Sequence, residues 1–307
     1  MYRVVITDCD FGRGEIEQEV LGEEFDVVAL EGDRQDVLAG VREADFLLVQ
    51  SAVIDEEVLA ASPRLRGVVR YGIGLDTIDL AAAEAKGVAV RNVDDYCMDE
   101  VPEHTVAMVV AASRRLWLLD HAVKEGRWGP GLVPAARPAG ESVVGIAGFG
   151  RIGKGVAERL HRLGYRICFW DSFEVPDVPE FATRCETLLD LARQSDFLAL
   201  HIPLTAETRG IIDGDVLEAL GYDGHLINTG RGGLIDESAL LDALDRGVIA
   251  SASLDVLVDE PPTRSGTSSR LANHPRVLAT PHIAYQSTRS METLRRHAAI
   301  RIQEILT

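Results

Sequence analysis

The chain has 307 residues, 46% hydrophobic and 26% charged, and its 31 Lys and Arg against 49 Asp and Glu give a net charge of −18. This length suits about two domains, each with a sizeable core. The negative charge argues against binding to nucleic acid or to an anionic membrane surface. No apolar run approaches the ~18 residues of a membrane span, and the N-terminal stretch MYRVVITDCD has no signal-peptide pattern.

The cysteines point to a reducing compartment. The four of them are Cys9, Cys97, Cys168 and Cys185, and they form neither a C-x-x-C pair nor a cluster with His. Reduced and mostly buried thiols are therefore expected, with no metal site. Together with the absence of targeting and membrane segments, this predicts a cytoplasmic protein.

Residues 1–98 alternate short apolar runs with helical patterns. Strands are expected at Arg3–Thr7, Asp26–Leu30, Phe46–Gln50, Val68–Tyr71 and Val88–Arg91. Helices are expected between them at Glu15–Leu21, Asp36–Glu43, Asp55–Ala60 and Asp79–Lys86. This alternation predicts a parallel sheet covered on both faces. Because no G-x-G-x-x-G occurs here, this part is predicted to be flavodoxin-like.

The loop after the fourth of these strands, RYGIGLD, is a candidate ligand site. Ligands of open α/β sheets bind beyond the carboxyl ends of strands. Gly72 and Gly74 would expose the backbone N–H groups around Ile73 to a carboxylate, and Arg70 would add positive charge. A plain βα turn without a ligand fits the spacing equally well.

The stretch Asp99–Asp120 is predicted to be one long helix with Pro102 in its first turn. Its side rich in Val, Ala, Met and Leu indicates a helix buried between domains or subunits. His104 near its start is interpreted as structural. A Gly, Pro and Ala-rich loop, Gly126–Gly140, follows it.

The stretch Ser142–Ser172 reads as a dinucleotide-binding unit. An apolar run, Val143–Ala147, is followed by Gly148, Gly150 and Gly153 in the pattern G-x-G-x-x-G, a helical pattern, a second apolar run and Asp171. The glycines allow a tight turn, close approach of a pyrophosphate and close packing of helix on sheet. The helix N-terminus favours phosphate. Asp171 suits ribose hydroxyls and would repel a 2′-phosphate, which favours NAD over NADP.

Four more strands are expected after Asp171, at Phe197–His201, His225–Asn228, Ala250–Leu254 and Val277–Ala279. Helices are expected at Cys185–Gln194, Asp213–Leu220, Glu237–Arg246 and Gln286–Leu306, and Asp259–Ser269 is expected to be a polar loop. The last helix is predicted to return to the first domain. Three polar residues, Arg231, Glu260 and His282, follow successive strands and so suggest a site at the carboxyl edge of the sheet.

Over nearly its full length the chain resembles the D-isomer-specific 2-hydroxyacid dehydrogenase family. The motifs that carry the resemblance are VGIAGFGRIG with Asp171, HIPLTAETRGII, NTGRGGLIDESAL, SLDVLVDEPP and PHIAY, in this order. The run VVRYGIGLDTIDLAAAEAKGVAVRNV is most similar to the branch around C-terminal-binding protein. The resemblance implies a Rossmann NAD-binding domain, residues 99–285, inserted into a flavodoxin-like substrate domain, residues 1–98 plus 286–307.

The resemblance also implies roles for single residues. Arg231, Glu260 and His282 would form the catalytic set. The cofactor cleft would be lined by Gly148, Gly150, Arg151, Ile152, Gly153, Asp171, His201, Pro203, Thr208, Thr229, Gly230 and Asp255. The substrate side would be formed by Arg70, Gly72, Ile73, Gly74 and Tyr285. Tyr285 stands where close relatives often carry Trp, so a more polar substrate side chain is expected.

The function implied is NAD-dependent interconversion of a small 2-oxo acid and its (R)-2-hydroxy acid. His282 would be the proton donor, Glu260 would orient its ring and favour imidazolium, and Arg231 would hold the substrate carboxylate. One alternative is a specialised biosynthetic reductase of a dianionic 2-oxo acid such as phosphonopyruvate. Another is a non-enzymatic, NADH-sensing interaction protein like the animal C-terminal-binding proteins. A homodimer through the NAD-binding domains is expected.

Overall fold

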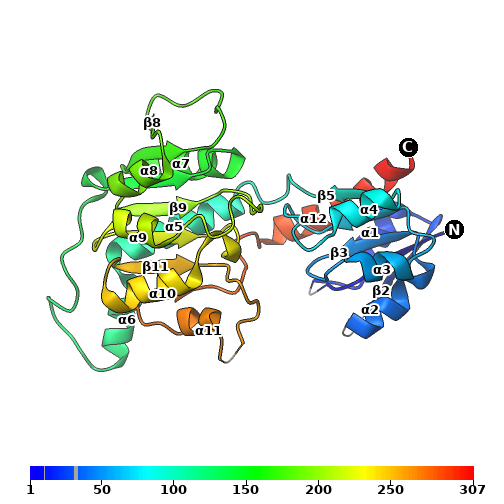
Figure 1. Ribbon diagram of the computed structural model, residues 1–307, viewed down its shortest axis with the longest axis horizontal. Coiled ribbons are helices and arrows are strands. Elements are labelled where there is room, and N and C mark those ends of the chain that lie inside the picture. Colours follow the sequence, from blue (N-terminus) through cyan, green and yellow to red (C-terminus); the bar gives the residue numbers. More distant parts are fainter. Residues whose placement is uncertain (10, 31–33, 264) are drawn as a thin grey trace. The chain divides into compact units, whose positions relative to one another are not determined.

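The structure is a computed structural model that describes residues 1–9, 11–30, 34–263 and 265–307 (Figure 1). The chain divides into two compact units. Unit 1 comprises Met1–Cys97 and Gln286–Thr307, and unit 2 comprises Met98–Tyr285. No helix in the described part of the chain combines the length and the apolar character needed to cross a membrane.

Unit 1 contains a five-stranded parallel sheet in the order β2-β1-β3-β4-β5. This is the strand order of flavodoxin-like folds, as the sequence predicted. The register pairs Val4 with Val27 on one side of β1 and with Phe46 on the other. The strands are β1 (Tyr2–Ile6), β2 (Phe25–Ala29), β3 (Phe46–Val49), β4 (Gly67–Arg70) and β5 (Ala89–Asn92).

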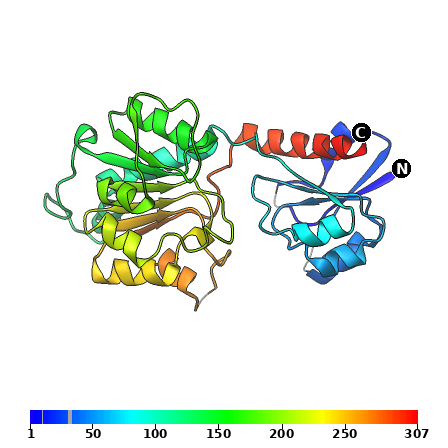
Figure 2. The ribbon, with the colours of Figure 1, turned by 45° about the horizontal axis from the view of Figure 1, so that its top comes forward.

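The helices of unit 1 cover both faces of this sheet (Figure 2). A core that includes Val5, Leu47, Val58 and Ala83 joins one face to α2 (Arg34–Gly40), η1 (Val41–Glu43), α3 (Glu56–Ala61) and α4 (Leu80–Ala85). The C-terminal helix α12 (Thr288–Leu306) packs against α1 (Glu15–Leu21) and β4. Helix α12 therefore packs on the sheet that is formed by the N-terminal residues.

A buried ion pair ties α12 to α1. Arg295 donates from Nε to Glu17 Oε1 at 2.9 Å and from a terminal nitrogen to Oε2 at 2.7 Å. The Tyr71 hydroxyl donates to the same carboxylate at 2.9 Å. Burial, followed by the negative charge of Glu17, raises the pKa of Tyr71 well above its ordinary value, so the hydroxyl remains a donor. Through Tyr71, the first residue after β4, this network anchors the start of the loop that follows the strand.

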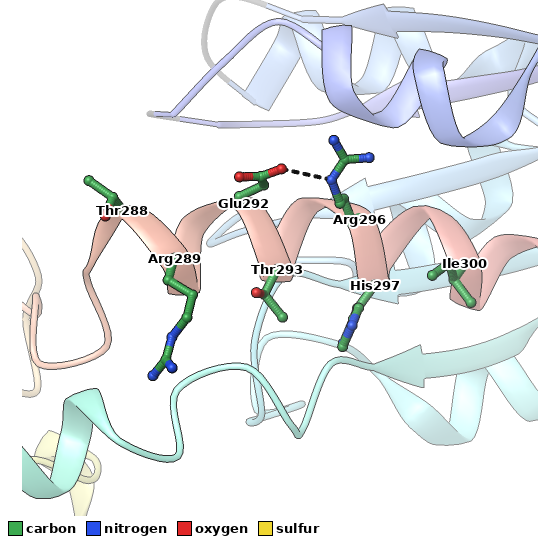
Figure 3. A pocket seen from close by; sticks show the side chains of 7 residues that line it. All are labelled: Thr288, Arg289, Glu292, Thr293, Arg296, His297 and Ile300. Atoms are coloured by element: carbon green, nitrogen blue, oxygen red, sulfur yellow. Dashed lines mark hydrogen bonds and ion pairs between the residues drawn. The ribbon is translucent and has the colours of Figure 1, made fainter.

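One face of α12 carries a pocket of about 420 Å³ (Figure 3). Its lining side chains project from successive turns of this helix, and Arg296 donates to Glu292 at 2.9 Å within it. The lining residues are Thr288, Arg289, Glu292, Thr293, Arg296, His297 and Ile300. None of them belongs to the predicted catalytic, cofactor-binding or substrate-binding residues.

Unit 2 contains a seven-stranded parallel sheet in the order β12-β11-β10-β9-β6-β7-β8. The direction in which successive strands are added to the sheet reverses between β6 and β9, which are parallel neighbours. This is the switch point where doubly wound sheets bind nucleotides. The predicted Rossmann arrangement is thus confirmed. The strands are β6 (Val143–Ala147), β7 (Arg166–Trp170), β8 (Ala182–Arg184), β9 (Phe197–Leu200), β10 (His225–Asn228), β11 (Ser251–Leu254) and β12 (Val277–Ala279).

Alternate residues of the central strands enter two cores. Phe197 and Ala199 of β9 pack on one face, while Leu198 and Leu200 pack on the other. The first face is covered by α5 (Glu100–Arg114) and α7 (Arg151–Arg162). The second is covered by α8 (Leu188–Gln194), α9 (Gly214–Leu220), α10 (Glu237–Arg246) and α11 (Thr267–Ala272).

Unit 2 differs from the sequence predictions in four details. The expected helix Asp99–Asp120 is broken at Arg115, which adopts φ 51° and separates α5 from α6 (Leu116–Lys124). The expected loop Asp259–Ser269, of which Arg264 lies outside the described residues, contains the start of α11. The short strand β8 was not predicted. The first helix after it begins at Leu188, capped by Thr187, and not at Cys185.

Candidate active site

The Gly-rich turn between β6 and α7 forms a cradle for an anionic group. Gly148 has φ 92°, and a Cβ there would lie 2.5 Å from the His201 carbonyl oxygen. A Cβ at Gly153 would lie 2.2 Å from the Gly148 oxygen, whereas nothing lies within 4 Å of the Cβ position of Gly150. Gly148 and Gly153 are thus required for packing, whereas Gly150 leaves space beside the helix N-terminus.

The N-terminus of α7 faces this space without a side-chain cap. Gly150 is the N-cap residue, and the first turn contains no acidic residue. The first N–H groups of a helix point out of its N-terminus, and together with the positive end of the helix dipole they suit a phosphate. Arg151 and Ile152, both predicted to line the cofactor cleft, begin this helix.

Asp171 follows β7 and is held by two backbone donors. The Phe149 N–H donates to Oδ2 at 2.7 Å, and the Phe173 N–H donates to Oδ1 at 3.0 Å. Each carboxylate oxygen retains acceptor capacity for a ribose hydroxyl. The contact with Phe149 also binds the Gly-rich turn directly to the acid.

The remaining predicted cofactor residues lie beyond β9 and β10. The Thr208 hydroxyl donates to the Pro203 oxygen at 2.7 Å, which closes the loop after His201. Burial lowers the pKa of His201 to about 4, so its ring is neutral at physiological pH. Thr229 bonds Thr105 of α5 through their hydroxyls at 2.9 Å, and the Gly230 N–H donates to Asn228 at 3.0 Å.

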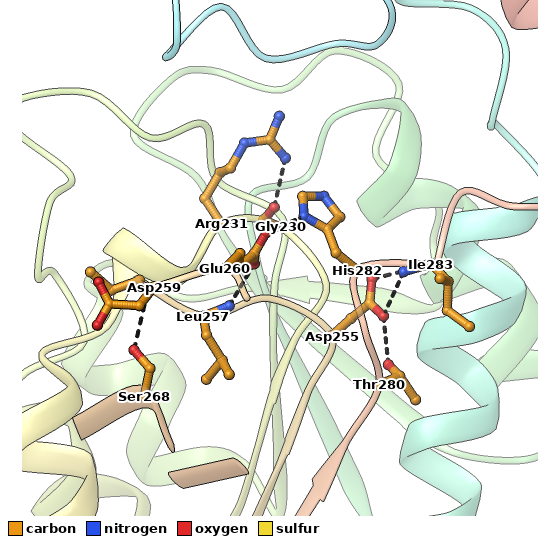
Figure 4. Close-up of polar contacts among 12 residues, drawn as sticks. Gly230, Arg231, Asp255, Leu257, Asp259, Glu260, Ser268, Thr280, His282 and Ile283 are labelled. Carbon is orange, nitrogen blue, oxygen red and sulfur yellow. Dashed lines mark hydrogen bonds and ion pairs between the residues drawn. The ribbon is translucent and has the colours of Figure 1, made fainter. Parts of the chain in front are cut away.

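Arg231, Glu260 and His282 meet at the carboxyl ends of β10, β11 and β12 (Figure 4). His282 Nδ1 lies 2.6 Å from Glu260 Oε2. Arg231 donates to the Gly230 carbonyl at 2.8 Å, and its positive charge acts on Glu260. Three residues that the sequence picked out separately are thus brought together by unit 2.

Glu260 is held in its charged form. Burial acts to raise its pKa, but the hydrogen bond and charge of His282, the Leu257 N–H and the charge of Arg231 outweigh burial and lower the pKa below its ordinary value. The Leu257 N–H donates to Oε1 at 2.8 Å, so Oε2 is the oxygen that serves the imidazole. A charged acceptor on Nδ1 fixes the orientation of the ring.

The backbone at His282 lies in the left-handed region, with φ 54°. Asp255, only 2% exposed, holds the loop in this shape. It accepts hydrogen bonds from the Thr280 hydroxyl, the Ile283 N–H at 3.0 Å and the Ala284 N–H at 2.9 Å. Such conformations persist at functional sites when the surroundings over-determine them.

Asp255 therefore has a structural role that the resemblance did not reveal, and its predicted contact with the cofactor stays a prediction. His104 of α5 supports the same loop, with Nε2 3.1 Å from the Thr280 hydroxyl and 3.7 Å from Asp255 Oδ1. The interpretation of His104 as structural agrees with this position. A lone helical His gave no signal that would have linked it to residues 280–284.

The sequence also gave no reason to single out Glu237. This residue begins α10, is 9% exposed and accepts from the Val258 N–H at 2.8 Å, two residues before Glu260. An acid in the first turn of a helix is common, since it favours the helix dipole. Only the fold shows that this one contacts the chain segment that carries Glu260.

The predicted substrate residues fall in both units. In unit 1, Gly72 has φ 137°, and a Cβ there would overlap the Arg70 guanidinium. The Gly72 N–H donates to the Arg70 oxygen at 2.9 Å, so this N–H already has an acceptor within the loop. Asn92 donates to the Ile73 oxygen at 2.7 Å, which leaves the N–H side of Ile73 and Gly74 as the candidate contact. In unit 2, the Tyr285 ring lies edge-on to that of His282, with centroids 6.2 Å apart.

The family of the chain is settled by its central region. Residues 106–284, more than half of the chain, match the family described as D-isomer specific 2-hydroxyacid dehydrogenase, NAD binding domain. The chain belongs to this family. The resemblance stated from the motifs is confirmed, while the closer likeness to the C-terminal-binding-protein branch stays a prediction.

Individual family members resemble the chain over most of its length. D-3-phosphoglycerate dehydrogenase of Mycobacterium tuberculosis is 37% identical over 275 residues, which cover 89% of this chain and 51% of that protein. The chain thus spans about half the length of such relatives. Within the described part of the chain, no group of three or more His, Cys, Asp or Glu residues could hold a metal ion.

Solved structures of the family share the fold. D-lactate dehydrogenase from Aquifex aeolicus, complexed with NAD and lactic acid, is 28% identical, with a TM-score of 0.90 over 99% of this chain and 95% of that one. An NADPH-dependent glyoxylate/hydroxypyruvate reductase from Sinorhizobium meliloti, in complex with NADP and malonate, is 29% identical, with a TM-score of 0.85 over 100% and 94% of the two chains. The fold is therefore compatible with either nicotinamide cofactor.

Proposed function

We propose that the protein is an NAD(H)-dependent oxidoreductase that interconverts a small 2-oxo acid and the corresponding (R)-2-hydroxy acid. The observation that carries this proposal is the set of Arg231, Glu260 and His282 at the carboxyl edge of a nucleotide-binding sheet (Figure 4). Unit 2 would be the NAD-binding domain, and unit 1 the substrate domain.

The bound nicotinamide would supply the hydride for C2 of the 2-oxo acid. His282 holds the proton for the carbonyl oxygen. Its Nδ1 is bound to Glu260, so Nε2 is the nitrogen that faces the substrate. Glu260 stays ionised and stabilises the imidazolium until the proton leaves. Arg231 presents a fixed fork of donors that can hold the carboxylate and polarise the carbonyl.

A preference for NAD over NADP is part of this proposal. The supporting observation is Asp171, whose carboxylate is fixed at the end of β7 by the N–H groups of Phe149 and Phe173. Its oxygens can accept from both ribose hydroxyls. A 2′-phosphate at the same place would meet a negative charge instead.

The substrate side of the proposal rests on the loop after β4 and on Tyr285. The N–H groups of Ile73 and Gly74 would bind the substrate carboxylate, and Tyr285, beside the His282 ring, would contact the substrate side chain. Arg70, whose guanidinium lies over Gly72, favours a second candidate substrate class, a dianionic 2-oxo acid. The relative named D-3-phosphoglycerate dehydrogenase supports including such acids among the compounds tested.

The test is NADH oxidation with a panel of 2-oxo acids. It comprises glyoxylate, pyruvate, hydroxypyruvate, a branched 2-oxo acid, phosphonopyruvate and the 2-oxo acid that forms when 3-phosphoglycerate is oxidised at C2. Turnover of at least one member is expected, with the (R)-2-hydroxy acid as the product wherever C2 of that product is chiral. Tight NADH binding without turnover of any member would contradict the proposal, and preference for the phosphorylated or phosphonate members would favour the dianionic class.

A homodimer through unit 2 is also proposed. The helix α6 and the loop that follows it expose apolar side chains, among them Leu116 at 53%, Val123 at 46% and Trp128 at 87%. Arg115 ties this segment to the Pro134 oxygen at 2.9 Å. Exposed apolar side chains concentrated in one segment of the chain support a protein–protein contact there.

A further inference from the structure

The segment that presents Glu260 to His282 is held by side chains from α10 and α11. Three consecutive backbone N–H groups of the segment 257–260, here called the Glu260 turn, each donate to a side-chain oxygen. Leu257 donates to Glu260 itself at 2.8 Å, Val258 to Glu237 Oε1 at 2.8 Å and Asp259 to the Ser268 hydroxyl at 3.1 Å.

Glu237 and Ser268 act as one unit. The Ser268 hydroxyl donates to Glu237 Oε2 at 2.6 Å, so both oxygens of the carboxylate are engaged. Glu237 is 9% exposed and Ser268 is 1% exposed. Hydrogen bonds to a charged acceptor are stronger than neutral ones, and loss of Glu237 would take this acceptor from the buried Ser268 hydroxyl. Figure 4 shows Ser268 reaching the Glu260 turn from α11, on the side away from His282.

The Arg231 side of the site is attached to the same turn. Gly232, directly after Arg231, begins η3 (Gly232–Leu234). A Cβ at Gly232 would lie 2.0 Å from the Leu257 carbonyl carbon and 2.5 Å from the Val258 nitrogen. The backbone next to Arg231 therefore packs against the backbone that Glu237 binds. A shift of the Glu260 turn would displace both Arg231 and Glu260.

We infer that Glu237, with Ser268, is a positioning residue for the reaction: it holds the Glu260 turn so that Glu260 meets His282 Nδ1 while Arg231 lies beside it. This inference rests on the proposed function. Glu237 would touch neither substrate nor cofactor, and acts through Glu260. Its backbone contact is with Val258, two residues away, so the carboxylate–imidazole distance of 2.6 Å depends on it.

The kinetic test compares Glu237→Ala, Glu237→Gln and Ser268→Ala with the wild type. Displacing a catalytic group by about 1 Å can cost on the order of 100-fold in rate, so Glu237→Ala is expected to lower kcat by roughly 10- to 100-fold. The affinity for NADH, measured by fluorescence, should stay within about twofold, because the Gly-rich turn is not altered. Glu237→Gln should recover most of kcat, since its amide oxygen can still accept from Val258.

The pH profile separates positioning from a general loss of stability. In the direction of 2-oxo acid reduction, His282 must supply a proton, and the Glu260 turn places a charged carboxylate against Nδ1 of its ring. A looser Glu260 turn should move the alkaline limb of kcat/KM to lower pH in Glu237→Ala and in Ser268→Ala. The matched control is Asp213→Ala, which removes the N-cap bond to Val216 in α9 and should lower Tm without moving this limb.

A readout that needs no turnover is the low-field proton resonance of the His282 Nδ1–H. It is assigned by its loss in Glu260→Gln, and it should weaken or disappear in Glu237→Ala and persist in Asp213→Ala. If Glu237→Ala does not fold, Ser268→Ala supplies the same comparison. The inference is overturned if Glu237→Ala and Ser268→Ala both keep this resonance, the wild-type position of the alkaline limb and the wild-type kcat, as the control does. Failure of the wild type to turn over any 2-oxo acid would instead contradict the proposed function, and the resonance would still decide the inference.

Discussion

His282 combines a left-handed backbone with a charged partner on its ring. The left-handed region is uncommon for residues other than glycine, and here Asp255 secures it through the N–H groups of Ile283 and Ala284. The backbone aims the ring, and Glu260 fixes which nitrogen is bound. Together these two features set the orientation of the imidazole, and we therefore regard this residue as the centre of the proposed site.

Replacing Glu260 by Gln should impair proton transfer while leaving the fold intact. The pKa of Glu260 is lowered below its ordinary 4.5, so its charge is present above that value and is lost only as pH falls through the lower, folded-state pKa. At neutral pH the substitution therefore removes a full charge beside the imidazole. We expect kcat to fall by roughly 10- to 100-fold and the alkaline limb of the reduction profile to move to lower pH. An unchanged pH profile would contradict this role.

Replacing Asp171 by Ala should change the choice of cofactor. The variant loses two acceptors for ribose and the charge that opposes a 2′-phosphate. NADH binding should weaken by about tenfold, or ~1.4 kcal/mol, and the preference for NADH over NADPH should narrow. Titration of both cofactors by fluorescence measures this. Glu174→Ala, which removes an exposed charge three residues further on, serves as the control and should leave the ratio unchanged.

At the scale of elements, the sequence predicted most of what positions the site. Apolar runs located the strands that precede Asp171, Arg231 and His282, because buried parallel strands are continuous apolar segments. The break at Arg115 could not be predicted, since neither Gly nor Pro marks it and Arg rarely adopts a left-handed conformation. Short elements such as β8 and α11 lack enough residues to show a period.

The contacts behind the site were also beyond the sequence. Glu237 and Ser268 are 31 residues apart, and only the packing of α10 and α11 brings them together. Asp255 and Thr280 directly follow the neighbouring strands β11 and β12, whose register no local pattern encodes. Motif spacing therefore identified the groups that face the reaction, whereas the groups that hold them emerged only from the tertiary structure.

The strand β10 carries a histidine that should make unit 2 sensitive to acid. His225 is 5% exposed and stacks on Phe197. Burial, and then the charge of Arg115, lowers its pKa from 6.5 to about 4. The unfolded chain therefore binds more protons between these values, and folding stability falls as pH drops below 6.5. The loss from this group at pH 5 is about 2 kcal/mol.

The check is thermal unfolding at pH 7.5 and pH 5. The wild type should lose several degrees of Tm between the two, and His225→Gln should lose less. His161→Gln replaces an exposed histidine of α7 and should keep the wild-type difference. Equal pH dependence in all three proteins would show that the buried ring does not contribute.

At the scale of the whole molecule, two parallel-sheet units of different strand order lie in one chain. The second is inserted into the first, and α12 closes unit 1 after unit 2 is complete. Such a design lets one unit hold the cofactor while the other supplies contacts to a substrate, which is the arrangement proposed above.

The assembly of these chains is open to a direct check. The apolar segment around α6 predicts a dimer, with about twice the 33.4 kDa of the chain in light scattering. Replacing the exposed Leu116 and Trp128 by Ser should lower the measured mass toward the monomer. A wild-type mass near 33.4 kDa would contradict the proposed dimer.

The central claim is that His282 donates the proton that accompanies hydride transfer to a 2-oxo acid. The most direct measurement compares NADH oxidation by the wild type and His282→Gln with the most active 2-oxo acid, alongside NADH binding by fluorescence. We expect kcat to fall by roughly 10²- to 10⁴-fold while NADH binds with unchanged affinity. A variant that keeps the wild-type kcat, with the same pH profile, would contradict the claim.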